Sequence, residues 1–253
     1  MDKKQLNKEL FTKRKDAYVN SRTHSNPAAL QKIAAWLNPS SEQIILDVAT
    51  GGGQVAKTLA PSAKQVIATD LTPSMLTNVR NSINENDNIF FMIADAEELP
   101  FLDHSFDIVT CRIAAHHFPH PEKFIQEAYR VLKPGGKCLF VDNVASEDEA
   151  EDQFLNQLEA MRDPSHGRAK KISEWKKLFS TYSFTLLQED IRIKELPFQD
   201  WLHRTTDTEE TRQQVIQFIQ TADEKLQKCI RLQKEKDRIQ SFAIDEWISM
   251  WEK

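Results

Sequence analysis

A glycine-rich stretch just after the first long apolar run contains the residues whose types and spacing most directly indicate chemistry. Gly51, Gly53 and Ala56 match the spacing G-x-G-x-x-G/A, which lets the backbone approach a bound nucleotide closely. Asp70 follows about 20 residues later, where its two carboxylate oxygens could accept hydrogen bonds from both hydroxyls of a ribose. Asp70 could instead cap the helix that begins near Thr72. The spacing alone predicts a nucleoside cofactor.

Asp47 distinguishes between the cofactors that such a loop can bind. A carboxylate so close to the glycines would repel a pyrophosphate by on the order of several kcal/mol at low effective dielectric. S-adenosylmethionine carries an ammonium and a sulfonium group in place of phosphates, and it keeps an adenosine for Asp70 to hold. We therefore favour S-adenosylmethionine. An NAD(P)-dependent oxidoreductase and a non-catalytic module that binds a nucleoside cofactor are the alternatives.

Three histidines, His116, His117 and His120, follow the fourth apolar run in the string IAAHHFPHPEKF. Histidine is the side chain best suited to accept a proton near neutral pH, so His117 and His116 are the candidates for a general base if the substrate must lose a proton. The alternative is that both are structural. Their spacing matches no standard metal-ligand motif, so we predict no metal.

Charge and cysteine content exclude several classes of protein. The chain has 33 Lys and Arg against 38 Asp and Glu, a formal charge of −5, which disfavours a nucleic-acid partner. Its three cysteines are widely spaced, which excludes a disulfide scaffold and a zinc module. The polar N-terminus and the lack of a long apolar run predict a cytoplasmic protein with no stable membrane association. We expect a small-molecule substrate. The sequence leaves the oligomeric state open, and a homodimer is one of the alternatives.

Alternating apolar runs and helical stretches predict the elements that position these residues. Strands are expected at 44–49, 65–70, 89–94, 106–111 and 137–142, with a helix starting at Pro73 and another over 124–132. Before them, residues 1–38 read as helices. After them come helices near 154–161 and 173–179, an extended stretch at 184–196, a helical region over 200–238 and a possible strand at 242–251. Within 200–238, one helix face would carry Val215, Ile219, Ala222, Leu226 and Ile230.

This order predicts an α/β fold, a doubly wound, Rossmann-like and mostly parallel sheet of seven strands with helices on both faces. We expect a single domain over 1–253. Within it, residues 1–38 would form a helical lid, 39–145 the cofactor-binding core, and 146–253 the remaining strands and a helical substrate cap.

Several motifs in the same order resemble the class I S-adenosylmethionine-dependent methyltransferases, in particular the quinone-biosynthesis C-methyltransferases. The resemblance covers roughly residues 17–145. It rests on the strings LDVATGGG, TDLTPSML, ADAEELPF, SFDIVTCR and EAYRVLKPGGKCLFVD. The chain departs from the family pattern at Ala49, which replaces the first glycine and has less freedom at positive φ.

The resemblance also implies a role for individual residues. Those implied for the methionine end of the cofactor are Asp47, Ala49, Thr50 and Gly51. Those implied for the adenosine are Asp70 at the ribose, Leu71 and Met75 on the adenine face, and Asp95 and Ala96 at the adenine edge. Cys111 and Arg112 would lie near the sulfonium, although Cys111 could be an ordinary buried thiol and Arg112 could pair with a surface acid. The segment 17–24 would fold over the site, where the Tyr18 ring could face the sulfonium or pack between helices.

Overall fold

The computed structural model describes residues 3–19, 25–83, 88–236 and 238–253, and for residues 15–19 it describes the backbone alone. The predicted role of Tyr18 therefore concerns a side chain outside the described part, and so does that of residues 20–24. Every residue and element below belongs to the described part of the chain.

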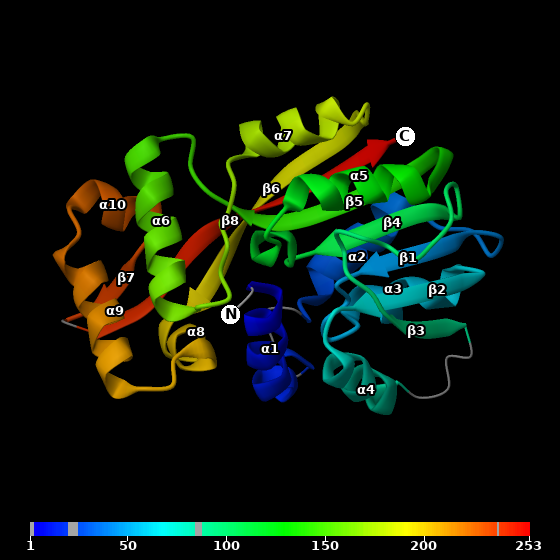
Figure 1. Ribbon diagram of the computed structural model, residues 1–253. Coiled ribbons are helices and arrows are strands. Elements are labelled where there is room, and N and C mark those ends of the chain that lie inside the picture. Colours follow the sequence, from blue (N-terminus) through cyan, green and yellow to red (C-terminus); the bar gives the residue numbers. More distant parts are fainter. Residues whose placement is uncertain (1–2, 20–24, 84–87, 237) are drawn as a thin grey trace.

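One mixed sheet forms the centre of the molecule (Figure 1). Its parallel part runs in the order β3 (Ile89–Ile93), β2 (Gln65–Asp70), β1 (Ile44–Val48), β4 (Phe106–Arg112) and β5 (Leu132–Val144). β8 (Arg238–Glu252) and β6 (Thr185–Pro197) continue it in antiparallel pairing. The fold class is as predicted, but the described sheet has eight strands and not seven, because the short β7 (Gln233–Glu235) also pairs with β8.

Helices cover both faces of the sheet and bury its apolar side chains. α2 (Pro27–Leu37) and α3 (Gln54–Leu59), which is followed by the 3-10 turn η1 (Ala60–Ser62), pack in one core cluster with Ile45 and Ile108. α5 (Pro121–Val131) and α7 (Ile172–Thr181) pack on the opposite face with Leu46 and Val109. Because β1 and β4 are buried on both faces, they are nearly continuous apolar runs, as expected for central parallel strands.

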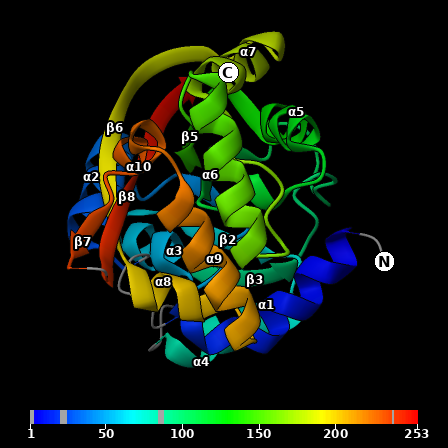
Figure 2. The same cartoon turned by 90° about the vertical axis from the view of Figure 1, so that its left-hand side faces the viewer.

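The last third of the chain adds a helical cap beside the sheet (Figure 2). A third apolar cluster joins the first half of β8 to four helices, α6 (Glu149–Arg162), α8 (Phe198–Thr205), α9 (Glu209–Thr221) and α10 (Glu224–Cys229). The predicted helical region over 200–238 is helical only as far as Cys229, and its end is wrong, since β7 and the start of β8 occupy it. The helix predicted to carry the apolar face breaks after Thr221, because the Asp223 side chain accepts the backbone N–H of Leu226 and starts α10.

Three further helices complete the fold near the carboxyl ends of the strands. α4 (Pro73–Ser82) follows β2, and the 3-10 turn η2 (Ala115–His117) follows β4. α1 (Lys3–Val19) lies between α4 and the cap helix α8, across this edge of the sheet (Figure 1). None of the described helices is long and apolar enough to cross a membrane.

Candidate functional site

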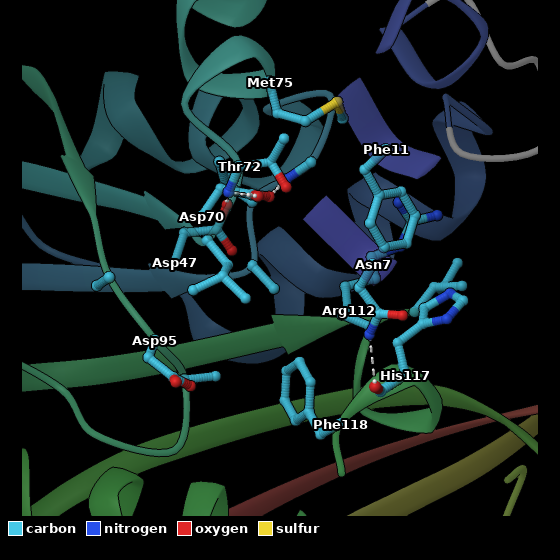
Figure 3. A pocket seen from close by; sticks show the side chains of 18 of the residues that line it. Asn7, Phe11, Asp47, Asp70, Thr72, Met75, Asp95, Arg112, His117 and Phe118 are labelled. Atoms are coloured by element: carbon cyan, nitrogen blue, oxygen red, sulfur yellow. Dashed lines mark hydrogen bonds between the residues drawn. The ribbon is translucent and has the colours of Figure 1, made fainter. Parts of the chain in front are cut away.

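A cavity of about 130 Å³ lies at the carboxyl ends of β1, β2 and β4, beneath α1 (Figure 3). Most of the residues predicted for a cofactor line it. They are Asp47, Ala49, Thr50, Gly51, Asp70, Leu71, Met75, Asp95, Ala96 and Arg112, and the predicted base His117 joins them. In a doubly wound sheet this edge is where ligands bind, because the chain leaves neighbouring strands in different directions there.

The glycine turn that forms one wall needs an unusual backbone. Ala49, Gly51 and Gly53 all have positive φ, at 53°, 53° and 71°. Gly53 is required for a second reason, since a Cβ there would lie 2.3 Å from Cγ1 of Val79 in α4. Ala49 therefore adopts the left-handed conformation despite its Cβ, although an alanine has less freedom there than the glycine of the family pattern.

Asp70 ties this turn to the end of β2. Its Oδ2 accepts the N–H of Gly51 at 3.1 Å, and its Oδ1 accepts the N–H of Thr72, the residue before α4, at 2.8 Å. Burial raises the pKa of Asp70 to about 6, against the opposing effect of these two hydrogen bonds. The Thr72 side chain adds a third hydrogen bond, but a carboxylate has about four lone-pair sites, so these contacts and one with a ribose are compatible.

Asp47 places a second buried carboxylate beside the turn, with an exposed fraction of 2%. Thr50 Oγ1 donates to its Oδ2 at 2.6 Å, and Thr110 Oγ1 donates to its Oδ1 at 2.7 Å. Burial raises the pKa of Asp47, and these hydroxyl donors oppose that rise. Two buried acids so close together make this end of the cavity a place for a cationic group.

α1 supplies three cavity residues that sequence reasoning missed. Asn7 Nδ2 donates to the carbonyl of His117 at 3.0 Å, and its buried Oδ1 has no hydrogen-bond partner among the described residues. Phe11 meets the His117 ring edge to face, with centroids 5.1 Å apart. Lys4 Nζ lies 2.6 Å from both Asp95 Oδ2 and Glu97 Oε2. The spacing of Lys4, Asn7 and Phe11 by three and four residues was the available signal, since it places all of them on one helix face.

The placement predicted for Cys111 is wrong. Cys111 has no exposed surface and lies in the apolar cluster under α5 and α7, where burial raises the pKa of its thiol well above the usual value. Successive residues of a strand point to opposite faces, and the β4 residue that lines the cavity is Arg112.

The two candidate bases occupy different cavities. His117 lines the first cavity, and its Nδ1 lies 3.1 Å from the carbonyl of Ser165. Burial lowers the pKa of His117 to about 3. His116 does not line the first cavity. It lines a second cavity. Its Nδ1 lies 2.5 Å from Asp142 Oδ1, and its backbone N–H donates to Asp142 Oδ2 at 2.9 Å. His120 is exposed and lies 3.4 Å from Glu122.

The second cavity has a volume of about 50 Å³ and lies between η2, α6, β6 and α8. It shares Ile113 and His117 with the first cavity, so the two are neighbours across the end of β4. No cluster of three or more His, Cys, Asp or Glu side chains in the described ranges could hold a metal ion.

The strand order, the glycine turn and the acids at the ends of β1 and β2 define a Rossmann-like protein of the class that binds nucleoside cofactors. Its family follows from comparison with known proteins. A family model described as a methyltransferase domain matches residues 46–140. The uncharacterized methyltransferase YcgJ of Bacillus subtilis is 34% identical over 232 residues, which cover 89% of this chain and 91% of YcgJ. The chain belongs to the class I S-adenosylmethionine-dependent methyltransferases.

Two further relatives show how far the similarity extends. A solved structure from Bacillus halodurans, described as a candidate methyltransferase, is 41% identical with a TM-score of 0.84, covering 89% of this chain and 97% of that chain. The ubiquinone/menaquinone biosynthesis C-methyltransferase UbiE of Rickettsia typhi is 41% identical, but over only 41% of this chain and 46% of its own length. The likeness to the quinone enzymes is therefore partial.

Proposed function

We propose that the protein transfers a methyl group from S-adenosylmethionine to a small-molecule acceptor by direct in-line displacement. The observation that carries this proposal is the buried Asp47 carboxylate beside the glycine turn in the first cavity. A pyrophosphate would be repelled there, whereas an ammonium or sulfonium would be attracted. The unpartnered Oδ1 of Asn7 in the same cavity offers a further acceptor for a cationic N–H donor.

The residues that line the first cavity could hold the cofactor in the following way. Asp47, Ala49, Thr50 and Gly51 would hold the methionine end, and Asp70 the ribose. Apolar cover for the adenine would come from Leu71 and Met75, and polar contacts at its edge from Asp95 and Ala96. Arg112 lines the same cavity. When bound, S-adenosylmethionine supplies a methyl carbon whose bond to sulfur breaks with the electron pair left on sulfur.

The chain's own contribution to the chemistry is alignment, exclusion of water and removal of a proton. Lys4, Asn7 and Phe11 of α1 cover the first cavity, so we assign this helix as the lid. The acceptor's nucleophilic atom would form the new bond to the methyl carbon, and its proton would pass to a histidine.

Of the two histidines, His116 is the better general base. A carboxylate on Nδ1 favours the tautomer with the proton at Nδ1, which leaves Nε2 on the far side of the ring as the proton acceptor. His117 has only a carbonyl and a hydroxyl at Nδ1, and its lowered pKa makes it a weaker base. His117 would instead shape the passage between the two cavities.

Calorimetric titration of the purified chain with S-adenosylmethionine, S-adenosylhomocysteine, NAD and NADP tests the cofactor. We expect micromolar binding of the first two and none of the nicotinamides. Binding of NAD or NADP alone would favour the oxidoreductase. Binding of S-adenosylmethionine with no turnover on any acceptor would favour a non-catalytic module.

A further inference from the structure

The second cavity differs from the first in being walled mainly by charged and polar side chains. Its cations are Arg162, Lys194 and Arg204, and its carboxylates are Glu159 and Asp163. Both carboxylates have donors from the protein itself. Arg162 Nη2 and Trp201 Nε1 donate to Glu159 at 2.6 and 3.2 Å, and the Ser165 N–H donates to Asp163 at 2.9 Å. The acids are thus occupied by their own neighbours.

The cations near Lys194 are less well balanced. Lys194 has only 5% of its side chain exposed, with Nζ 3.0 Å from Asn143 Oδ1 and 3.3 Å from Glu246 Oε2. Glu246 is already bound by Arg192, whose Nη2 lies 2.6 Å from Oε1. Arg192 and Lys194 therefore share one carboxylate, that of Glu246.

A buried ammonium that shares its carboxylate with a second cation is costly unless a further anion compensates it. Asp142, below the second cavity, is bound by the His116 ring and by two backbone N–H groups. Lys194 has three N–H donors, and the described residues accept two of them, so one is left for a ligand.

We propose that the methyl acceptor is a small acid whose carboxylate binds Lys194 in the second cavity. Its nucleophilic atom then lies at the passage formed by Ile113 and His117, within reach of the base His116. This inference rests on the proposed function and adds the class of acceptor to it. A substrate of the quinone class, which the name of the UbiE relatives implies for those proteins, would place no carboxylate beside the buried Lys194 ammonium.

The test is calorimetric titration of the full chain, with and without bound S-adenosylhomocysteine. The ligands are hydroxy, amino and thiol acids, each paired with its own carboxamide, together with a short-chain hydroquinone. We expect at least one acid to bind about tenfold or more tightly than its amide, as for loss of a hydrogen bond to a charged group. Equal binding of acid and amide, binding of the hydroquinone alone, or binding of no acid would overturn the proposal.

Variants locate the effect. Lys194→Met should weaken binding of that acid about tenfold, and Arg204→Gln, a half-buried change at the cavity wall, should weaken it several-fold. Lys176→Met is the matched control, because Lys176 also pairs with a glutamate, Glu189 at 2.6 Å, but lines neither cavity. Unchanged acid binding in both cavity variants would overturn the proposal. Failure of S-adenosylhomocysteine to bind the unaltered chain would contradict the proposed function instead.

Discussion

The two neighbouring cavities are built in different ways. The first is made chiefly from the ends of β1, β2 and β4, and its key residues lie within short motifs whose spacing carries the chemistry. The second is assembled from η2, α6, β6 and α8, segments far apart in the chain that have no motif in common. One cavity thus lies largely within the range that the methyltransferase family model matches, while most of the other lies outside that range. We infer that the division between them is the division between donor and acceptor of the methyl group.

The most direct test of this division is to remove the proposed base, His116, from the second cavity. With an acid that the titration identifies as acceptor, His116→Gln should lower turnover by about 10²–10⁴-fold, the usual contribution of a general base. Affinity for S-adenosylhomocysteine should stay within about twofold, because His116 does not line the first cavity. The measurement is the rate of S-adenosylhomocysteine release. His120→Gln, which changes an exposed side chain, is the control. An unchanged rate in His116→Gln would show that His116 is not the general base.

The converse change acts on the first cavity. Asp70→Ala should weaken S-adenosylhomocysteine binding by about 1–3 kcal/mol, the range for loss of a buried charged hydrogen-bond partner. Binding of the acid to the chain without cofactor should not change. Calorimetry measures both affinities, with Asp190→Ala as a control on an exposed acid that pairs with Lys32. If acid binding falls as much as cofactor binding, the two cavities do not act as separate sites.

The same division explains which features were predictable from sequence. The strands at 65–70 and 106–111 and the glycine turn follow from local patterns, because apolar runs and positive φ are decided within a few residues. The contact of Lys4 with Asp95 joins residues 91 positions apart, and no local pattern encodes it. Cys111 shows a different error. It was assigned to the site together with Arg112, although adjacent residues of a strand point in opposite directions.

The pH dependence of cofactor binding should also separate the cavities. Burial raises the pKa of Asp70 to about 6, so the protonated group contributes stability that is fully present below about pH 4 and is lost as the pH rises from there through about 6. Cofactor binding has the opposite sign, because the ribose hydroxyls need the carboxylate. Affinity for S-adenosylhomocysteine should fall by about tenfold from pH 7 to pH 5. The pKa of Asp47 is raised as well, so it contributes to the same pH dependence. The Asp70→Asn variant removes the contribution of Asp70. If its binding affinity depends on pH as that of the unaltered chain does, Asp70 is not the titrating group.

The smallest expected effect concerns the lid, which belongs to the first cavity through its contacts. Lys4 holds Asp95 and Glu97 at once, but its side chain is 28% exposed, so these ion pairs are screened and contribute about 0.2–1 kcal/mol. Lys4→Met should therefore weaken S-adenosylhomocysteine binding by only a few-fold, and 1 M salt should have a similar effect on the unaltered chain. Lys13→Met, at an exposed pair with Asp207 on the same helix, is the control. If the ion pair between Lys4 and Asp95 must break before the adenine can contact Asp95, Lys4→Met will tighten binding instead. In that case α1 competes with the cofactor for Asp95.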